Sequence, residues 1–147
     1  MKTTVKMKTK TNVRKGPSNW AAAGTIILLF NMSVGAQTST WVAPAAEAAK
    51  VNPVKSDAST LKDAKKIYTN TCGVCHGEKG KGDGVAAVAC KPKPADHTSQ
   101  KIHDESDGSL FWKMTTGKGP MPTYKKILTE QQRWELVNYI RTLYKGK

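Results

Sequence analysis

Apolar residues recur at the spacing of an α-helix in three stretches of this chain. The stretches run from residue 61 to 71, from 107 to 116 and from 130 to 144, and their apolar positions are Leu61, Ala64, Ile67 and Tyr68; Leu110, Phe111 and Met114; and Trp134, Val137, Ile140 and Tyr144. Residues three or four apart lie on one face of a helix, so each stretch predicts an amphipathic helix. No stretch alternates apolar and polar residues as a strand does, and an all-α fold is expected.

Polar residues and glycine mark the ends of these predicted helices. Thr60 and Thr129 each stand three residues before an acidic or amide side chain, which is the spacing of a capping box at a helix start. Ser106 is the expected N-cap of the middle helix, and Gly117 is its expected end.

The segments between the helices carry residues that break regular structure. Four glycines between residues 77 and 84 exclude a regular element there and allow the backbone to pass close to a flat ligand. Residues 91–94 are expected to be extended, because proline restricts its own backbone and that of the preceding residue. Met121 stands between Pro120 and Pro122 on a stiff loop, where core packing does not explain a methionine well.

The N-terminal part of the chain differs in composition from the rest. Residues 1–19 are polar and basic without an acidic residue, residues 20–30 are apolar, and small residues close the run at Ala36. This order is typical of a signal peptide, so we predict a signal peptide over residues 1–36 that is cleaved after Ala36.

Two alternatives remain open for this region. Ala48 ends a second candidate cleavage site. Residues 20–36 are alternatively an uncleaved membrane anchor, although the run is shorter than the roughly 20 residues of a spanning helix.

Residues 37–57 are rich in Ala, Ser, Thr, Pro and Val without a sustained period, which predicts a flexible leader. The folded domain is then expected over residues 58–147.

The chain is basic, with 24 Lys and Arg against 11 Asp and Glu. Removing residues 1–36 leaves 18 basic and 11 acidic residues, so the predicted mature domain keeps a net charge of +7. This balance favours an acidic partner and fast, salt-sensitive association. Nucleic acid is disfavoured by the predicted export and by the lack of a binding motif.

The five residues Cys72-Gly73-Val74-Cys75-His76 carry the clearest chemistry of the chain. Two thiols and an adjacent imidazole at this spacing are what covalent haem attachment requires. Both cysteines lie on one helical turn, from which they can reach the two vinyl groups of a porphyrin, while the histidine binds the iron. Cys90 is the third cysteine of the chain and has no fourth cysteine as a partner, so a disulfide framework does not explain Cys72 and Cys75.

Two alternative hypotheses for this pentad each require further features elsewhere in the chain. A thioredoxin-like dithiol would need a βαβ context, and no alternating strand precedes Cys72. A structural zinc site would need Cys90 and His97 as further ligands, but the chain has no second close pair of ligands.

Further motifs extend beyond the pentad, and together they resemble one known family. They are His-Gly-x-x-Gly-x-Gly-Asp-Gly at residues 76–84, Lys-Pro-Ala-Asp at 93–96, Asp-Gly-Ser-Leu-Phe-Trp at 107–112 and Gly-Pro-Met-Pro-Thr-Tyr at 119–124. With them, residues 59–145 resemble a class I c-type cytochrome of the small bacterial monohaem kind, including cytochrome c subunits of respiratory complexes. The resemblance implies a small cytochrome c fold with helices around one covalently bound haem, and with the N- and C-terminal helices packed together.

The resemblance also assigns roles to residues. It implies one haem c held by thioether bonds to Cys72 and Cys75, with His76 as the proximal iron ligand and Met121 as the distal one. A carbonyl of Pro92 or Pro94 would orient the His76 ring, as a proline segment does in relatives. The competing distal ligands are Met114, which helical spacing places in the core, and the loop histidines His97 and His103.

The function that follows from this resemblance is one-electron transfer. A Met/His pair fills both axial positions of the iron, so the protein would act as a periplasmic carrier or as an electron-relaying subunit of a respiratory complex, and would not be an enzyme on its own. Its partner would be an acidic redox protein or a membrane respiratory complex. The alternative is a five-coordinate haem enzyme or gas sensor of peroxidase type, which would require Met121 to be displaced.

Overall fold

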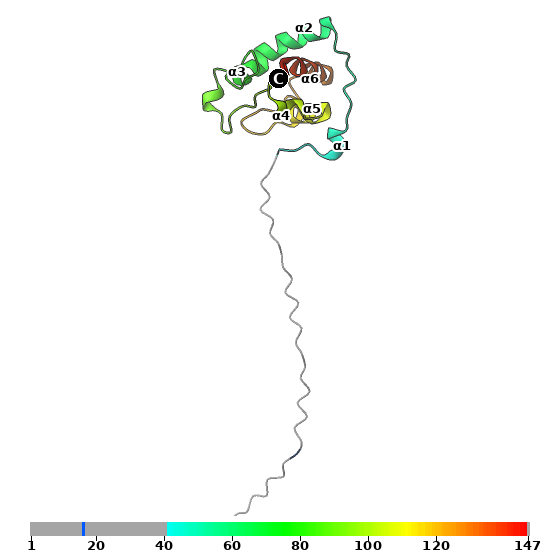
Figure 1. Cartoon of the computed structure of the whole chain (residues 1–147), viewed down its shortest axis with the longest axis vertical. Coiled ribbons are helices and arrows are strands. Elements are labelled where there is room, and N and C mark those ends of the chain that lie inside the picture. Colours follow the sequence, from blue (N-terminus) through cyan, green and yellow to red (C-terminus); the bar gives the residue numbers. More distant parts are fainter. Residues whose placement is uncertain (1–15, 17–40, 147) are drawn as a thin grey trace, which may run out of the picture. The chain divides into compact units, whose positions relative to one another are not determined.

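The computed structural model describes Gly16 and residues 41–146, and these residues form helices and turns without a strand (Figure 1). The helices are α1 (Ala45–Ala48), α2 (Ala58–Ile67), α3 (Gly73–His76), α4 (Gln100–His103), α5 (Asp107–Thr116) and α6 (Glu130–Leu143), with a π-helical turn at Tyr68–Cys72 and a 3-10 turn at Ala87–Ala89. The predicted all-α fold is confirmed. The predicted signal peptide over residues 1–36 lies outside the described residues, apart from Gly16, and stays a prediction.

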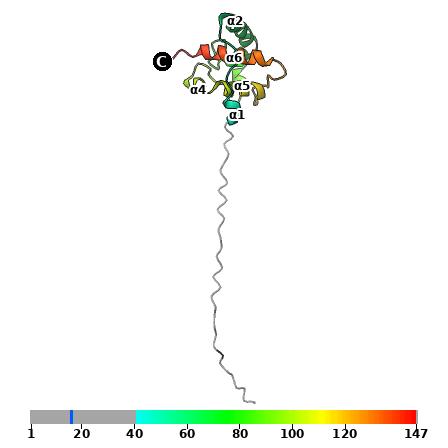
Figure 2. The ribbon, with the colours of Figure 1, turned by 90° about the vertical axis from the view of Figure 1, so that its right-hand side faces the viewer.

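α2 and α6 pack along each other (Figure 1, Figure 2), and α6 is the more buried of the two helices. Tyr68, Leu136 and Val137 are fully buried between the helices. Phe111 of α5 stacks on Trp134 of α6, with ring centroids 3.9 Å apart. The expected packing of the N-terminal against the C-terminal helix is therefore confirmed.

Capping residues begin α5 and α6 where the sequence predicted. The Ser106 side chain accepts a hydrogen bond from the Ser109 N–H at 3.2 Å, and Gly117 ends α5 with φ of 64°. Thr129 and Gln132 form a reciprocal capping box at the start of α6.

The start of α2 differs from the prediction. The N-cap is Asp57, whose carboxylate accepts hydrogen bonds from the Ser59 and Thr60 N–H groups at 3.0 and 2.9 Å. Thr60 returns the contact, because its Oγ1 accepts from the Asp57 N–H at 3.1 Å. Thr60 is thus the third residue of the helix rather than its cap, since an ionised carboxylate is the stronger acceptor for free N–H groups.

The segment before α2 also differs from the prediction of a flexible leader over residues 37–57. Residues 41–57, which we name the N-terminal strap, pack on α5 and α6 and run outside the helices from α1 to α2 (Figure 1). Trp41 lies against Trp112 of α5, with ring centroids 6.5 Å apart. At Gly108 of α5 a Cβ atom would meet the Glu47 carbonyl oxygen at 2.1 Å, so only glycine allows this close approach.

Side-chain amides fasten the other end of the strap. Asn52 Nδ2 donates to the Trp134 carbonyl oxygen at 3.1 Å and to Asn138 Oδ1 at 2.9 Å. Asn138 Nδ2 donates in turn to the Val54 carbonyl oxygen at 3.0 Å. These contacts come from backbone carbonyls and single amides, which leave no periodic pattern in the sequence, and this is why the composition alone predicted a flexible leader.

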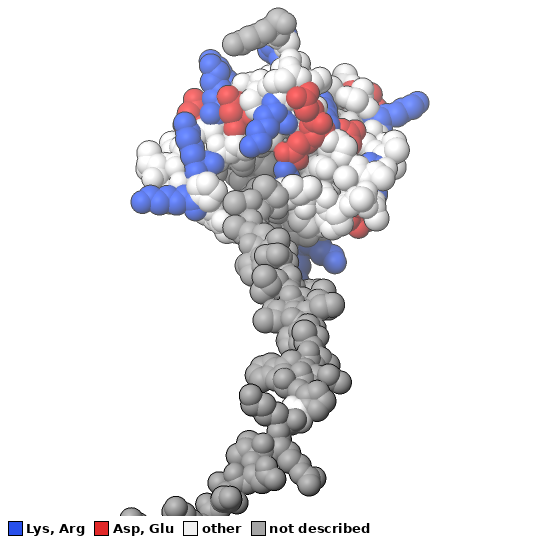
Figure 3. All heavy atoms as spheres, turned by 60° about the horizontal axis from the view of Figure 1, so that its bottom comes forward, with Lys and Arg blue, Asp and Glu red and all other residues white. Residues whose placement is uncertain are grey.

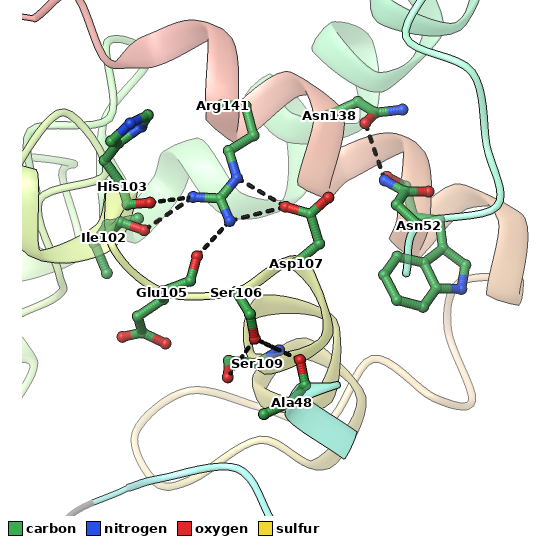
Figure 4. A network of polar contacts seen from close by, with 11 residues as sticks. Ala48, Asn52, Ile102, His103, Glu105, Ser106, Asp107, Ser109, Asn138 and Arg141 are labelled. Atoms are coloured by element: carbon green, nitrogen blue, oxygen red, sulfur yellow. Dashed lines mark hydrogen bonds and ion pairs between the residues drawn. The ribbon is translucent and has the colours of Figure 1, made fainter. Parts of the chain in front are cut away.

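Arg141 of α6 joins that helix to the end of α4 and the start of α5 (Figure 4). Its guanidinium forms an ion pair with Asp107 at 2.8 Å and donates to the carbonyl oxygens of Ile102, His103 and Glu105. One planar side chain therefore satisfies three backbone carbonyls and a carboxylate. Within the described residues, none of the helices has the length and apolarity needed to cross a membrane.

Candidate functional site

The Cys-x-x-Cys-His motif lies where α2 changes into α3 through the π-helical turn. Cys72 is the last residue of that turn and is buried with 7% of its surface exposed, whereas Cys75 in α3 is partly exposed. His76 ends α3, and Gly77 leaves the helix with φ of 78°. Single π-turns inside helices often occur at functional sites, and here the turn sets the positions of the two thiols.

The glycine-rich loop folds back on the end of α3 and binds its free carbonyl groups. The N–H groups of Gly82, Gly84 and Ala86 donate to the carbonyl oxygens of His76, Cys75 and Val74, at 2.7, 3.1 and 2.9 Å respectively. A Cβ atom on Gly84 would lie 2.3 Å from the Val74 oxygen, so this close contact requires glycine. The loop therefore holds the motif in place through its backbone.

The His76 ring is oriented by a backbone carbonyl. Its Nδ1 lies 2.9 Å from the Ala95 carbonyl oxygen, which assigns the ring proton to Nδ1 and leaves Nε2 free to bind a metal. Burial lowers the pKa of His76, which favours the neutral ring, the form that can bind a metal. The expectation that Pro92 or Pro94 supplies this carbonyl is wrong, because the group belongs to Ala95, the residue after Pro94.

His97 lies against His76 rather than in a solvated loop. The two rings stack with centroids 4.0 Å apart and planes 19° apart. His97 Nδ1 lies 2.9 Å from the hydroxyl of the buried Tyr68, and its backbone N–H donates to the Gly80 carbonyl oxygen at 2.6 Å. Burial lowers the pKa of His97 to about 3, so this ring is neutral as well.

The other candidate ligands take different places. Met114 is buried with 4% exposed in the core, as its helical spacing predicted. His103 stacks on Tyr144 with ring centroids 4.1 Å apart. His97 stacks on His76 and contacts the Tyr68 hydroxyl, so it would not serve as a separate ligand.

Met121 is carried by a tight turn after α5. The backbone groups of Lys118 and Met121 exchange two hydrogen bonds of 3.0 and 2.9 Å. Gly117 has φ of 64°, and a Cβ atom there would lie 2.5 Å from the carbonyl carbon of Pro122. The turn is thus fixed on both sides, and the Met121 side chain is partly buried against the core cluster that contains Cys72.

Cys90 is a site residue that sequence reasoning missed. Its Sγ lies 4.0 Å from Cys75 Sγ, and its thiol donates to the Ala86 carbonyl oxygen at 3.3 Å. Neither periodicity nor spacing indicates this contact, because the loop fold brings the residues together.

The donor set of the motif fits haem c better than it fits a zinc ion. In residues 41–146, no group of three or more His, Cys, Asp or Glu side chains is placed to hold a metal ion. Two thiols beside a neutral imidazole with a free Nε2 suit covalent attachment of a porphyrin and one axial bond to its iron. The zinc alternative with Cys90 and His97 therefore lacks its ligand geometry.

Acidic and basic side chains are both exposed around the motif, and the acidic ones are Glu78, Asp83 and Asp96. The loop lysines of the motif region, Lys79, Lys81, Lys91 and Lys93, are exposed. On the face seen in Figure 3, Lys and Arg side chains stand between Asp and Glu side chains. A partner on that face would meet charges of both signs.

Comparison with known proteins places this geometry in context. A sequence model of the family described as cytochrome c matches residues 61–144. A chain of the Kuenenia stuttgartiensis reducing HAO-like protein complex Kustc0457/Kustc0458 is similar at 31% identity and a TM-score of 0.55, over 63% of this chain and 47% of that chain. This chain therefore spans about half the length of that relative.

A second solved structure, the KustC0563 c-type cytochrome, is similar at 23% identity and a TM-score of 0.47, over 56% of this chain and 98% of that one. The comparison with curated protein sequences gave no match.

Proposed function

The chain belongs to the cytochrome c family, and we propose that it transfers single electrons through one haem c with His76 and Met121 as axial ligands. Family membership implies a covalently bound haem and a role in electron transfer. The observation that carries the proposed iron ligation is the orientation of the His76 ring. The Ala95 carbonyl holds its Nδ1, and Nε2 stays free to bind the iron.

The residues around the haem would have separate tasks. Cys72 and Cys75 would form the two thioether bonds, and His76 would bind the iron through Nε2. When bound, the haem iron supplies a one-electron ferrous and ferric couple. The protein restricts this chemistry by fixing the ligands, since the Ala95 carbonyl and the His97 ring both hold the His76 imidazole in one orientation.

Two observations support the proposal that Met121 is the distal ligand. Its turn is fixed by two backbone hydrogen bonds, and its thioether is partly buried. The competing candidates are engaged elsewhere: Met114 in the core, His97 against His76, and His103 against Tyr144. If His76 and Met121 both bound the iron, no open iron site would be left for oxygen or peroxide, and the protein would transfer electrons rather than act as a five-coordinate enzyme or sensor.

The partner and the compartment follow from sequence and similarity. The similar Kuenenia chain is part of a multi-subunit complex, which supports a role for this chain as an electron-relaying subunit rather than as a free carrier. The basic mature domain supports an acidic redox protein or membrane respiratory complex as partner. The predicted signal peptide over residues 1–36 supports a periplasmic location, and an uncleaved segment at 20–36 would keep the protein at the membrane.

The absorption spectrum of the purified ferric protein tests the axial ligands. We expect the weak far-red charge-transfer band of methionine-ligated haem in the wild type, and its loss in Met121→Ala. Met114→Leu is the matched control, since it removes the other candidate thioether while keeping a similar volume in the core. A wild type without the band, with high-spin iron that binds carbon monoxide readily when reduced, would support the enzyme or sensor instead.

A further inference from the structure

The His76 ring is contacted both at its edge and on its face. At the edge, Nδ1 lies 2.9 Å from the Ala95 carbonyl oxygen. On the face, the His97 ring stacks with centroids 4.0 Å apart and planes 19° apart. The edge contact fixes the direction of the Nδ1–H group, and the face contact limits the swing of the imidazole about that hydrogen bond. One short segment, residues 95–97, supplies both contacts.

Tyr68 fixes the His97 ring in turn. Its side chain is fully buried, and its hydroxyl oxygen lies 2.9 Å from His97 Nδ1. Within the described residues this hydroxyl has no other hydrogen-bond partner, so if it accepted a proton from His97, its own O–H would be buried without an acceptor. The Tyr68 hydroxyl therefore donates to Nδ1, which leaves the ring proton of His97 on Nε2.

Three segments of the chain meet at this tyrosine–histidine pair. Tyr68 begins the π-helical turn that leads into the haem-attachment motif. The His97 N–H donates to the Gly80 carbonyl oxygen at 2.6 Å. Gly80 has φ of 78°, and a Cβ atom there would lie 3.2 Å from His97 Cβ and 3.3 Å from the Tyr68 hydroxyl oxygen. On the third segment, the Asp96 carboxylate accepts from the Thr98 N–H and hydroxyl at 2.8 and 2.6 Å.

We propose that Tyr68 and His97 are positioning residues for His76, and that together they lower the reduction potential of the haem. The inference rests on the proposed function, because it requires His76 to bind the iron, but it does not require Met121 to bind as well. A hydrogen bond from Nδ1–H raises the basicity of an imidazole ligand, and a more basic ligand favours ferric iron. The pair holds the ring where it donates to Ala95, so loosening the pair should raise the potential.

Core packing alone does not account for the Tyr68 hydroxyl. Tyr68 belongs to the same buried cluster as Ala64, Leu136 and Val137. A phenylalanine would fill this space without a hydroxyl that needs an acceptor. A buried polar pair whose groups are satisfied specifies one arrangement of the side chains that it joins. Here the side chain joined to the core is the ring that stacks on His76.

Tyr139 provides a control from the same core. Its ring centroid lies 5.0 Å from that of Tyr68, and the residue is buried with 9% of its surface exposed. In the part of the chain that the structure describes, its hydroxyl forms no hydrogen bond to His97 or to another residue. Tyr139→Phe therefore removes a hydroxyl from the same aromatic cluster and leaves the His97 contact intact.

The midpoint potential of the haem-bound protein tests the inference. Tyr68→Phe removes only the hydroxyl that fixes His97, and Tyr139→Phe is the matched control. Relative to the control, we expect Tyr68→Phe to raise the ratio of ferrous to ferric protein at a fixed solution potential by at least about three-fold, a shift of about 28 mV for a one-electron couple. Equal potentials for the two variants would overturn the inference.

Proton NMR of the ferric protein shows whether the His76 ring moves. The haem methyl resonances of a ferric haem depend on the orientation of the axial histidine. We expect their spread to change in Tyr68→Phe and to stay as in the wild type in Tyr139→Phe. A changed potential with an unchanged methyl pattern in Tyr68→Phe would overturn the positioning role, since the hydroxyl would then act only through the local polarity.

A double variant covers the case in which Tyr68→Phe does not fold. That single change leaves His97 Nδ1 without its donor, whereas Tyr68→Phe combined with His97→Leu removes both polar groups and leaves neither unpaired. The double variant also lacks the stacked imidazole. We therefore expect its potential and its methyl pattern to differ from those of Tyr139→Phe by at least as much. A folded double variant that matches the control in both would overturn the inference.

The far-red band of methionine-ligated haem separates this inference from the proposed function. If the wild type lacks the band while Tyr68→Phe still differs from Tyr139→Phe in potential and methyl pattern, the electron-transfer proposal fails and the positioning role stands. If the wild type has the band and the two variants agree, the positioning role fails and the proposed function stands.

Discussion

Two regions of this domain are held together by different chemistry. In the motif wall, residues 72–97, segments are joined by backbone N–H groups that donate to backbone carbonyls across the glycine-rich loop. On the strap side, formed by the N-terminal strap with α5 and α6, the joining groups are side chains: Asn52, Asn138 and Arg141. In both regions the groups that accept these hydrogen bonds are mainly backbone carbonyl oxygens.

This difference has consequences for substitution. Backbone bonds depend on dihedral angles and on the absence of a Cβ atom, so the motif wall should be sensitive at its glycines. Side-chain bonds depend on one functional group, so the strap side should be sensitive at its amides and guanidinium. Gly108 is the strap-side exception, because it is required for space beside the Glu47 carbonyl oxygen.

The largest expected effect is at Gly82 in the motif wall. Its φ is 70°, and a Cβ atom would lie 2.5 Å from the Pro94 carbonyl oxygen. Gly82→Ala adds a left-handed backbone cost of roughly 1–2 kcal/mol and a steric cost of roughly 1–3 kcal/mol. We therefore expect a loss of about 3 kcal/mol in the free energy of unfolding, measured by urea denaturation of the haem-bound protein.

Gly119→Ala is the matched control for Gly82→Ala. Nothing lies within 4 Å of a Cβ atom at Gly119, so the change in stability should stay within about 0.5 kcal/mol. A Gly82→Ala variant as stable as this control would show that the motif wall can shift its backbone, and the contrast between the two regions would disappear.

The second effect is on the strap side, at Arg141. Arg141→Met keeps the apolar stem but removes the ion pair to Asp107 and the bonds to three carbonyls. Because these groups are only partly exposed, we expect a loss of about 2–3 kcal/mol in urea denaturation. Lys66→Met removes an exposed ion pair with Asp63 and should cost less than about 0.5 kcal/mol. Equal losses for the two variants would contradict the role given to Arg141.

A double-mutant cycle at Asn52 and Asn138 sharpens the comparison. Asn52→Ala leaves polar groups of α6 without a partner, and Asn138→Ala leaves polar groups of the strap without one, so each substitution should cost about 1–2 kcal/mol. The two losses should not add, and a coupling energy of about 0.5 kcal/mol or more is expected from thermal or urea unfolding. Additive losses would mean that the strap is not fastened by this amide pair.

The smallest expected effect is the pH dependence at Asp57. Hydrogen bonds from Thr60 hold the pKa of its carboxyl below the usual value, so its contribution is present above the unfolded pKa and is lost as the pH falls through the folded pKa. Asp57→Asn keeps an N-cap without this titration. The difference in stability between wild type and variant should therefore shrink as the pH of the unfolding measurement is lowered from about 5 to about 2. If the difference stays constant over this pH range, the charge of the Asp57 carboxylate does not contribute to the free energy of unfolding.

The sequence predicted those parts of the structure that repeat or that follow a fixed spacing. Helical periodicity and capping residues located α5 and α6, and the pentad indicated haem attachment. It did not reveal Ala95 as the partner of His76, because any residue offers a carbonyl and no side chain marks the one that is used. The stacking of His97 on His76 was missed for a related reason, since a loop of alternating glycines sets the position of His97.

The N-terminal strap was missed because its signals are single contacts. Asn52 and Gly108 are ordinary residues in the sequence, and only the fold shows that one binds α6 and the other admits a carbonyl oxygen. Asp57 was overlooked as a cap because Thr60 also has a capping-box partner three residues later. Within the motif wall, the short distance between Cys75 and Cys90 comes entirely from the loop fold.

The strap also limits how far the domain could travel from a membrane. If residues 20–36 are retained as an anchor, a free segment over residues 37–57 would allow a reach of about 75 Å, at up to roughly 3.6 Å for each residue. The strap binds residues 41–57 to the domain, which leaves residues 37–40 and a reach of about 14 Å. An anchored protein would then keep the start of its strap close to the membrane surface, and a cleaved one would be free to diffuse.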